Sequence, residues 1–176
     1  PDGDWCGVNN EISVLLETGC YADFTLPAAP DSCQTRAVNS IYYAIDNPQK
    51  PKPHDRALPA RVGSQPPQDG LLLIQGPLCT DWSRRKLGVL PGLDNGDLHA
   101  GFPPTIDRFR TWLAARVHVT GRPDWIFIKL HTHGAPEHNA MMLLSEEMHM
   151  FHVELRRWIE ARGCSLHYVN AYEMAN

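Results

Sequence analysis

The chain lacks the features that would assign it to a membrane or to nucleic acid. No run approaches the roughly 18–20 apolar residues of a membrane-spanning helix. Positive charge is not in excess, since 16 Lys and Arg stand against 20 Asp and Glu. Because binding to a phosphate backbone depends on clustered positive charge, we expect no nucleic-acid partner and no membrane span.

Paired cysteines are also missing. The five cysteines are odd in number and none is spaced as C-x-x-C, which argues against a disulfide framework or a zinc ribbon. We predict reduced thiols in a cytoplasmic protein. A single bridge, Cys6–Cys20 or Cys20–Cys33, stays open as an alternative.

Several catalytic motifs are absent as well. The chain has no G-x-S-x-G, no G-x-G-x-x-G, no Walker loop and no H-E-x-x-H. These absences exclude the common serine hydrolases, dinucleotide enzymes and P-loop enzymes. A metal-assisted hydrolase or a non-catalytic domain remains, together with a thiol hydrolase in which Cys20 or Cys33 lies near a histidine.

The composition and the expected order of helices and strands indicate one domain over residues 1–176. The chain is 43% hydrophobic and carries five Trp, five Tyr and five Phe, enough for a core. Apolar spacing and capping residues predict helices that begin after Asn9 or Asn10, at Pro104 or Thr105, and after Ser145. Strands are expected at residues 20–25, 40–45, 71–75, 125–130 and 166–170. From residue 71 onward strand and helix alternate, which predicts an α/β fold with a mainly parallel sheet.

Histidine is abundant, and two of the nine histidines end the most apolar strand segment. His131 and His133 are two residues apart, so in an extended chain their imidazoles point to the same side. They could bind one metal ion or take part in catalysis at the carboxyl edge of the sheet. The alternative is that one hydrogen-bonds the loop and the other is solvated.

Other candidate residues lie in the first half of the chain. Asp23 interrupts an apolar strand, where a carboxylate is costly to bury unless it is paired, metal-bound or catalytic. His54 lies between prolines in a long loop, and we place it with the possible metal ligands. Each could equally be a surface residue.

Three residues are candidates for binding substrate. Tyr21 and Trp82 could stack on sugar rings. Arg84 begins a run of three basic residues that could hold an anionic substrate, although such runs are more often solvated.

Six strings resemble a poorly characterised bacterial family that is similar to polysaccharide deacetylases of carbohydrate esterase family 4 and is often associated with exopolysaccharide biosynthesis. They are Trp5–Glu11 (WCGVNNE), Thr18–Thr25 (TGCYADFT), Asn39–Ala44 (NSIYYA), Gln75–Pro77 (QGP), Lys129–Gly134 (KLHTHG) and His167–Met174 (HYVNAYEM). The resemblance covers nearly the whole chain.

The resemblance implies a partial or distorted (β/α) barrel that removes an acetyl group, as an ester or amide, from a saccharide. In such enzymes an Asp and two His hold a divalent metal, usually zinc, while a carboxylate acts as base and a late His as acid. By this resemblance His131 is the catalytic histidine, His133 is its partner or a ligand, and Asp23 faces the substrate.

The chain lacks the early Asp-Asp and H-x-x-x-H motifs of the deacetylases, which in longer relatives would precede Trp5. We therefore expect the C-terminal part of a longer barrel. Because an incomplete barrel leaves sheet edges open, we also expect a homodimer. A second hypothesis is a non-catalytic carbohydrate-binding or assembly domain that retains the fold.

Overall fold

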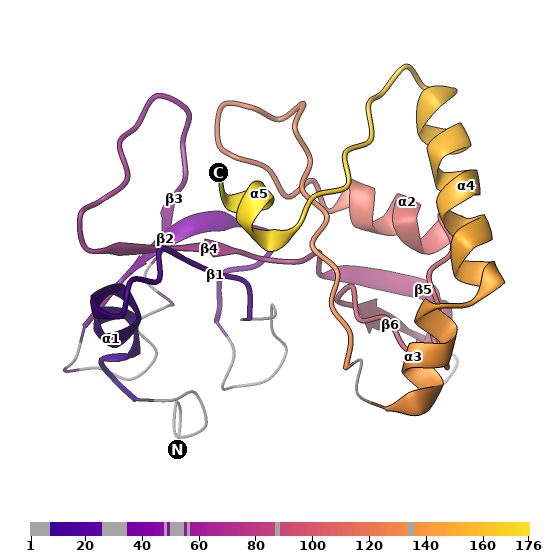
Figure 1. Cartoon of the computed structure of the whole chain (residues 1–176), viewed down its shortest axis with the longest axis horizontal. Coiled ribbons are helices and arrows are strands. Elements are labelled where there is room, and N and C mark those ends of the chain that lie inside the picture. The colour runs from indigo at the N-terminus through magenta and orange to yellow at the C-terminus, as the bar shows by residue number, and fades with distance from the viewer. Residues whose placement is uncertain are drawn as a thin grey trace.

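The computed structural model describes residues 8–25, 35–47, 49, 55, 57–86, 89–133 and 136–176 (Figure 1). Its elements along the chain are α1 (Glu11–Glu17), β1 (Ala22–Asp23), β2 (Ile41–Ile45), β3 (Ala57–Pro59), β4 (Gly70–Ile74), β5 (Cys79–Lys86), β6 (Leu90–Asp94), α2 (Ile106–Ala114), α3 (Glu137–Leu143), α4 (Glu146–Glu160) and α5 (Ala171–Ala175). The strands form a four-stranded sheet and a separate two-stranded sheet.

The starts of α2 and α4 follow from local capping chemistry. The hydroxyl of Thr105 accepts a hydrogen bond from the backbone N–H of Arg108 at 3.2 Å, and α2 begins one residue later. Ser145 caps α4 in the same way through the N–H of Met148, also at 3.2 Å. A side-chain oxygen at this position satisfies one of the orphan donors of the first turn. The three predicted helix starts are confirmed.

The four-stranded sheet lies between α1 and α5 (Figure 1). Its order is β1-β4-β2-β3, and only the β1–β4 pair is parallel. Because side chains alternate along a strand, Leu71 and Leu73 of β4 meet Ile12 of α1 on one face. Ile74 packs on the opposite face in the cluster to which Met174 of α5 contributes.

The second half of the chain packs around α2 and α4. Its buried core residues are Leu98, Phe109, Trp112, Met148, Phe151, Leu155 and Ile159. The α4 members repeat every three to four residues, which is the spacing of one helix face. Met148, Phe151, Leu155 and Ile159 of α4 are buried, whereas Trp158 on the same helix is only partly buried.

The predicted fold class is wrong. Instead of a mainly parallel sheet or a partial (β/α) barrel, the described residues form small, mostly antiparallel sheets and no closed barrel. The segments expected as strands at 125–130 and 166–170 join neither sheet. Without them no strand–helix–strand crossover can form after residue 71, and the hairpin of β5 and β6 follows β4 instead.

Candidate functional site

The candidate site is built on the extended segment that ends in the two histidines. His131 donates its backbone N–H to the Gly96 carbonyl at 3.1 Å, and its own carbonyl accepts from the N–H of Leu98 at 2.8 Å. Gly76 lets the segment pass close by, since a Cβ there would lie only 2.7 Å from the Lys129 carbonyl oxygen. These contacts fix the backbone on both sides of His131.

His131 lies beside Asp97, because the two residues face each other in an isolated parallel bridge. Burial lowers the pKa of the half-buried His131 imidazole, the Asp97 charge opposes that shift, and Lys129 and His133 reinforce it. The Oδ1 atom of Asp97 is buried and accepts no hydrogen bond from the described residues. The site therefore holds an imidazole that is mainly neutral near pH 7 next to a carboxylate with unused acceptor capacity.

His133 is exposed. The third predicted metal ligand, His54, lies outside the described residues. Within the part of the chain that the structure describes, no three His, Cys, Asp or Glu side chains gather as a metal site. Zinc sites use at least three protein ligands, so a zinc ion bound by His131 and His133 would need a further ligand from outside the described residues.

Asp23 lies next to Lys129, and Lys129 precedes His131 by two residues. The Lys129 ammonium donates a hydrogen bond of 2.6 Å to the Phe24 carbonyl, which ties the end of β1 to the histidine segment. Burial lowers the pKa of Lys129, and the charge of Asp23 opposes that shift. Asp23 Oδ1 also accepts from the N–H and hydroxyl of Thr25 at 2.6 and 2.7 Å. The predicted Asp23 and His131 thus flank one buried lysine.

The three predicted substrate-binding residues do not form one group. Tyr21 precedes β1, and its hydroxyl accepts a hydrogen bond of 3.0 Å from Asn176 at the end of α5. Trp82 and Arg84 belong to β5, in the other sheet, and both are exposed. Arg84 is linked to the His131 region through the aromatic ring of Phe102.

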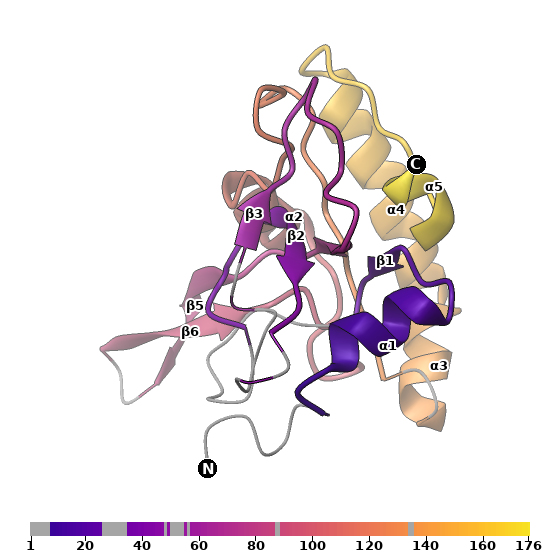
Figure 2. The ribbon, with the colours of Figure 1, turned by 90° about the vertical axis from the view of Figure 1, so that its left-hand side faces the viewer.

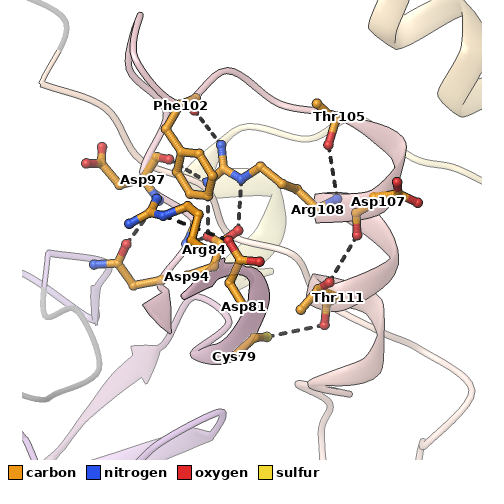
Figure 3. A network of polar contacts seen from close by, with 12 residues as sticks. Cys79, Asp81, Arg84, Asp94, Asp97, Phe102, Thr105, Asp107, Arg108 and Thr111 are labelled. Atoms are coloured by element: carbon orange, nitrogen blue, oxygen red, sulfur yellow. Dashed lines mark hydrogen bonds and ion pairs between the residues drawn. The ribbon is translucent and has the colours of Figure 1, made fainter. Parts of the chain in front are cut away.

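A buried polar network supports the loop that carries Asp97 (Figure 3). Arg108 donates to Asp94 from Nε at 2.8 Å and from its second terminal nitrogen at 3.0 Å. The same terminal nitrogen donates to the Asp97 carbonyl at 2.8 Å. Arg108 therefore positions the backbone of Asp97 opposite His131.

Sequence reasoning missed Arg108, Asp94 and Asp97. The one available signal is the polar string Asp94–Asp97 (DNGD), which is typical of a tight turn and here contains Gly96 at φ 78°. Arg108 gives no signal, because it lies next to the apolar positions of α2.

A small cavity of about 160 Å³ lies between the four-stranded sheet and α5. Its lining residues are Ile41, Tyr43, Ala60, Arg61, Leu72, Ile74, Val119, Phe127, Met174 and Ala175. None of the candidate site residues lines it, so this cavity is separate from the histidine site.

In comparisons with known proteins, no family model, no curated protein and no solved structure matches the chain. No helix in the described ranges is both long enough and apolar enough to cross a bilayer. Any functional conclusion therefore depends on the site itself.

Proposed function

We propose that the chain is a hydrolase of the carbohydrate deacetylase type, which cleaves an acetyl ester or amide from a saccharide. The observation that supports this proposal best is His131, a half-buried imidazole whose pKa is lowered by burial and whose backbone is fixed beside Asp97. A general base must be unprotonated at the working pH, and it works best when its pKa lies near that pH and its geometry is fixed.

In the proposed reaction, neutral His131 takes a proton from the water that attacks the acetyl carbonyl. It then returns that proton to the leaving oxygen or nitrogen, so that the products are acetate and a free hydroxyl or amine. Asp97 stabilises the transient imidazolium by its charge. Asp23, whose charge acts on Lys129, is a second candidate base.

Acetate release from an acetylated saccharide, or from a chromogenic acetate ester, tests the proposal. We expect His131→Gln to lower kcat/KM by at least about 100-fold, as is typical of losing a general base. His167→Gln is the matched control, since His167 is exposed on the segment after α4. Equal rates for the two variants, or no acetate from the wild type, would overturn the proposal.

A divalent metal, expected to be zinc, remains part of the proposal and is tested separately. Elemental analysis of the full chain, with and without His131→Ala and His133→Ala, measures whether a metal binds. Wild-type protein that stays metal-free after incubation with zinc would remove the metal from the proposal without affecting the role of His131.

A non-catalytic carbohydrate-binding domain is the second candidate. It is favoured by Trp82 and Arg84, which are exposed together on β5. Glycan binding without acetate release would support this candidate, and measurable turnover would exclude it.

We also propose a homodimer and a cytoplasmic location. The dimer is supported by exposed Val89 and Leu90 on the β5–β6 hairpin, which projects from the rest of the chain (Figure 2). The location is supported by Cys20, Cys79 and Cys164, which are free thiols. Sedimentation that shows only monomer at high concentration would exclude the dimer, and recovery of the native protein outside the cytoplasmic fraction would exclude the location.

A further inference from the structure

The β5–β6 hairpin contains a bulge that turns three consecutive side chains outward. Asp81 pairs with Gly92 and Arg85 pairs with the preceding residue, Pro91. Residues 82–84 therefore stand opposite no residue of β6. Gly92 makes room for them, since a Cβ there would lie 2.8 Å from the Arg84 carbonyl oxygen. Bulges of this kind redirect side chains and are common next to functional sites.

Within the bulge, Arg84 is held in place but keeps much of its surface. Its guanidinium lies 3.9 Å from the centre of the Phe102 ring, and Arg108 lies 3.4 Å from the centre of the same ring. The nearest carboxylate oxygen, on Asp81, is 3.9 Å from Arg84 Nε, and the other Asp81 oxygen accepts two hydrogen bonds from Ser83. The Arg84 side chain is 46% exposed. The Arg84 guanidinium is therefore held in an orientation in which it can bind an anion.

Trp82 supplies a flat apolar surface from the same bulge. Its side chain is 61% exposed, on the sequence Trp-Ser-Arg-Arg-Lys. An aromatic ring packs against the C–H face of a sugar, while a guanidinium binds a carboxylate through two parallel hydrogen bonds. The combination matches a sugar that carries a carboxylate.

We infer that the bulge surface, defined as Trp82, Ser83 and Arg84, binds an acidic saccharide, with Trp82 stacked on a sugar ring and Arg84 paired with its carboxylate. This inference rests on the proposed function, because it names the substrate class of that hydrolase. The bulge surface is connected to the site: Arg84 stacks on Phe102, and Arg108, on the same ring, also binds the Asp97 carbonyl.

Calorimetry with the full chain tests the inference, using a galacturonic acid trimer and a neutral galactose trimer as probes. We expect the wild type to prefer the acidic trimer and to lose that preference as salt is raised. Arg84→Gln should weaken binding of the acidic trimer roughly tenfold and leave the neutral trimer unaffected. Trp82→Ala should weaken both by at least about fivefold.

The chain offers a matched control for these two variants. Arg122 stacks on Trp125, with 4.1 Å between the guanidinium and the ring centre, and Trp125 is 56% exposed. Arg122→Gln and Trp125→Ala therefore remove the same groups from another surface and should leave binding unchanged. Equal losses for both pairs, or a wild type that does not distinguish the two trimers, would overturn the inference.

Three further outcomes separate this inference from its alternatives. Binding of a single-stranded oligonucleotide as tightly as the acidic trimer would overturn it, because the surface would then recognise phosphate and bases. Binding of the acidic trimer, with no acetate released from its acetylated form, would leave the bulge surface supported while the proposed hydrolase fails. Equal turnover of acidic and neutral acetylated sugars by the wild type, unchanged in Arg84→Gln, would contradict the inference and support the hydrolase.

Discussion

Arg108 and Asp94 form a buried two-point ion pair at the base of the β5–β6 hairpin (Figure 3). The two hydrogen bonds measure 2.8 and 3.0 Å, and both side chains are almost fully buried. Breaking such a pair leaves one buried charge without its partner. Because Arg108 also holds the Asp97 carbonyl, this pair connects the stability of the hairpin to the geometry of the histidine site.

The first prediction concerns this pair. Asp94→Asn should lower the free energy of unfolding by about 3–5 kcal/mol, because the Arg108 charge stays buried. The control is Asp107→Asn, which removes an exposed carboxylate paired with Arg110 on the same helix and should change little. Urea unfolding at neutral pH measures both variants. A loss for Asp94→Asn no greater than that of the control would contradict the prediction.

The same carboxylate makes stability depend on pH. Burial alone would raise the pKa of Asp94, but the hydrogen bonds from Arg108 and Gly96 outweigh it, and the pKa is lowered. A carboxylate whose pKa is lower in the folded state stabilises the fold fully at pH values above its unfolded pKa of about 3.9. This stabilisation is lost as the pH falls below that value. Wild-type stability should thus fall more steeply than that of Asp94→Asn between about pH 5 and 2. Parallel slopes in urea unfolding across this range would contradict the assignment.

The close approach at Gly76 gives the next prediction. In Gly76→Ala the new Cβ would lie 2.7 Å from the Lys129 carbonyl oxygen, so the histidine segment must shift. We expect a loss of about 1–3 kcal/mol, as for other overpacked sites, together with reduced acetate release. Gly101→Ala is the control, since its nearest neighbours, two atoms of the His99 ring, are 3.4 Å away. Similar thermal unfolding of the two variants would contradict the close approach.

Cysteine reactivity provides a test that does not depend on enzyme activity. Burial, with a smaller contribution from Asp94, raises the pKa of Cys79 to about 11, and its thiol points to the Thr111 carbonyl at 3.2 Å. Cys20 and Cys164 are exposed. Because the thiolate is the reactive form, iodoacetamide at neutral pH should label these two thiols and spare Cys79 until the protein unfolds. Peptide mass mapping measures each site, and early labelling of Cys79 would contradict its burial.

A cysteine substitution tests the thiol-hydrolase alternative at one of its two candidate residues. Cys20→Ala should retain acetate release, because the proposed reaction uses His131. Loss of activity in this variant, with normal folding, would favour Cys20 as the nucleophile. The other candidate, Cys33, lies outside the described residues.

Local signals were sufficient to predict α1, α2 and α4, but α3 and α5 were not predicted and the sheets were predicted only in part. Thr105 and Ser145 cap helices through bonds within their own first turns, so a short window of sequence contains the whole interaction. A strand needs a partner elsewhere in the chain. Residues 166–170 alternate like a strand, yet only Leu166 is partly buried there and no strand pairs with them. The strand β5 was not predicted, because its own residues are polar and its strand structure depends on pairing with β6.

The candidate site was likewise predictable where its signal is local and unpredictable where it depends on distant segments. His131 was predicted because its spacing from His133 is local. Its neighbour Asp97 was not, because the bridge between them joins two distant segments that only the folded chain brings together. Lys129 between Asp23 and His131 was likewise unpredictable, since its hydrogen bond to Phe24 spans most of the described chain.

The final prediction follows from the pairing of His131 with Asp97. Burial is the largest cause of the lowered His131 pKa, and the Asp97 charge partly offsets it. Asp97→Asn removes that charge, so the His131 pKa should fall further and the acidic limb of the kcat/KM profile should move to lower pH. NMR titration of the imidazole measures the shift without any substrate. His167 in the same spectra is the internal reference and should not move. An unchanged or raised His131 pKa in Asp97→Asn would show that the carboxylate does not act on this imidazole, and the proposed base would then lack its partner.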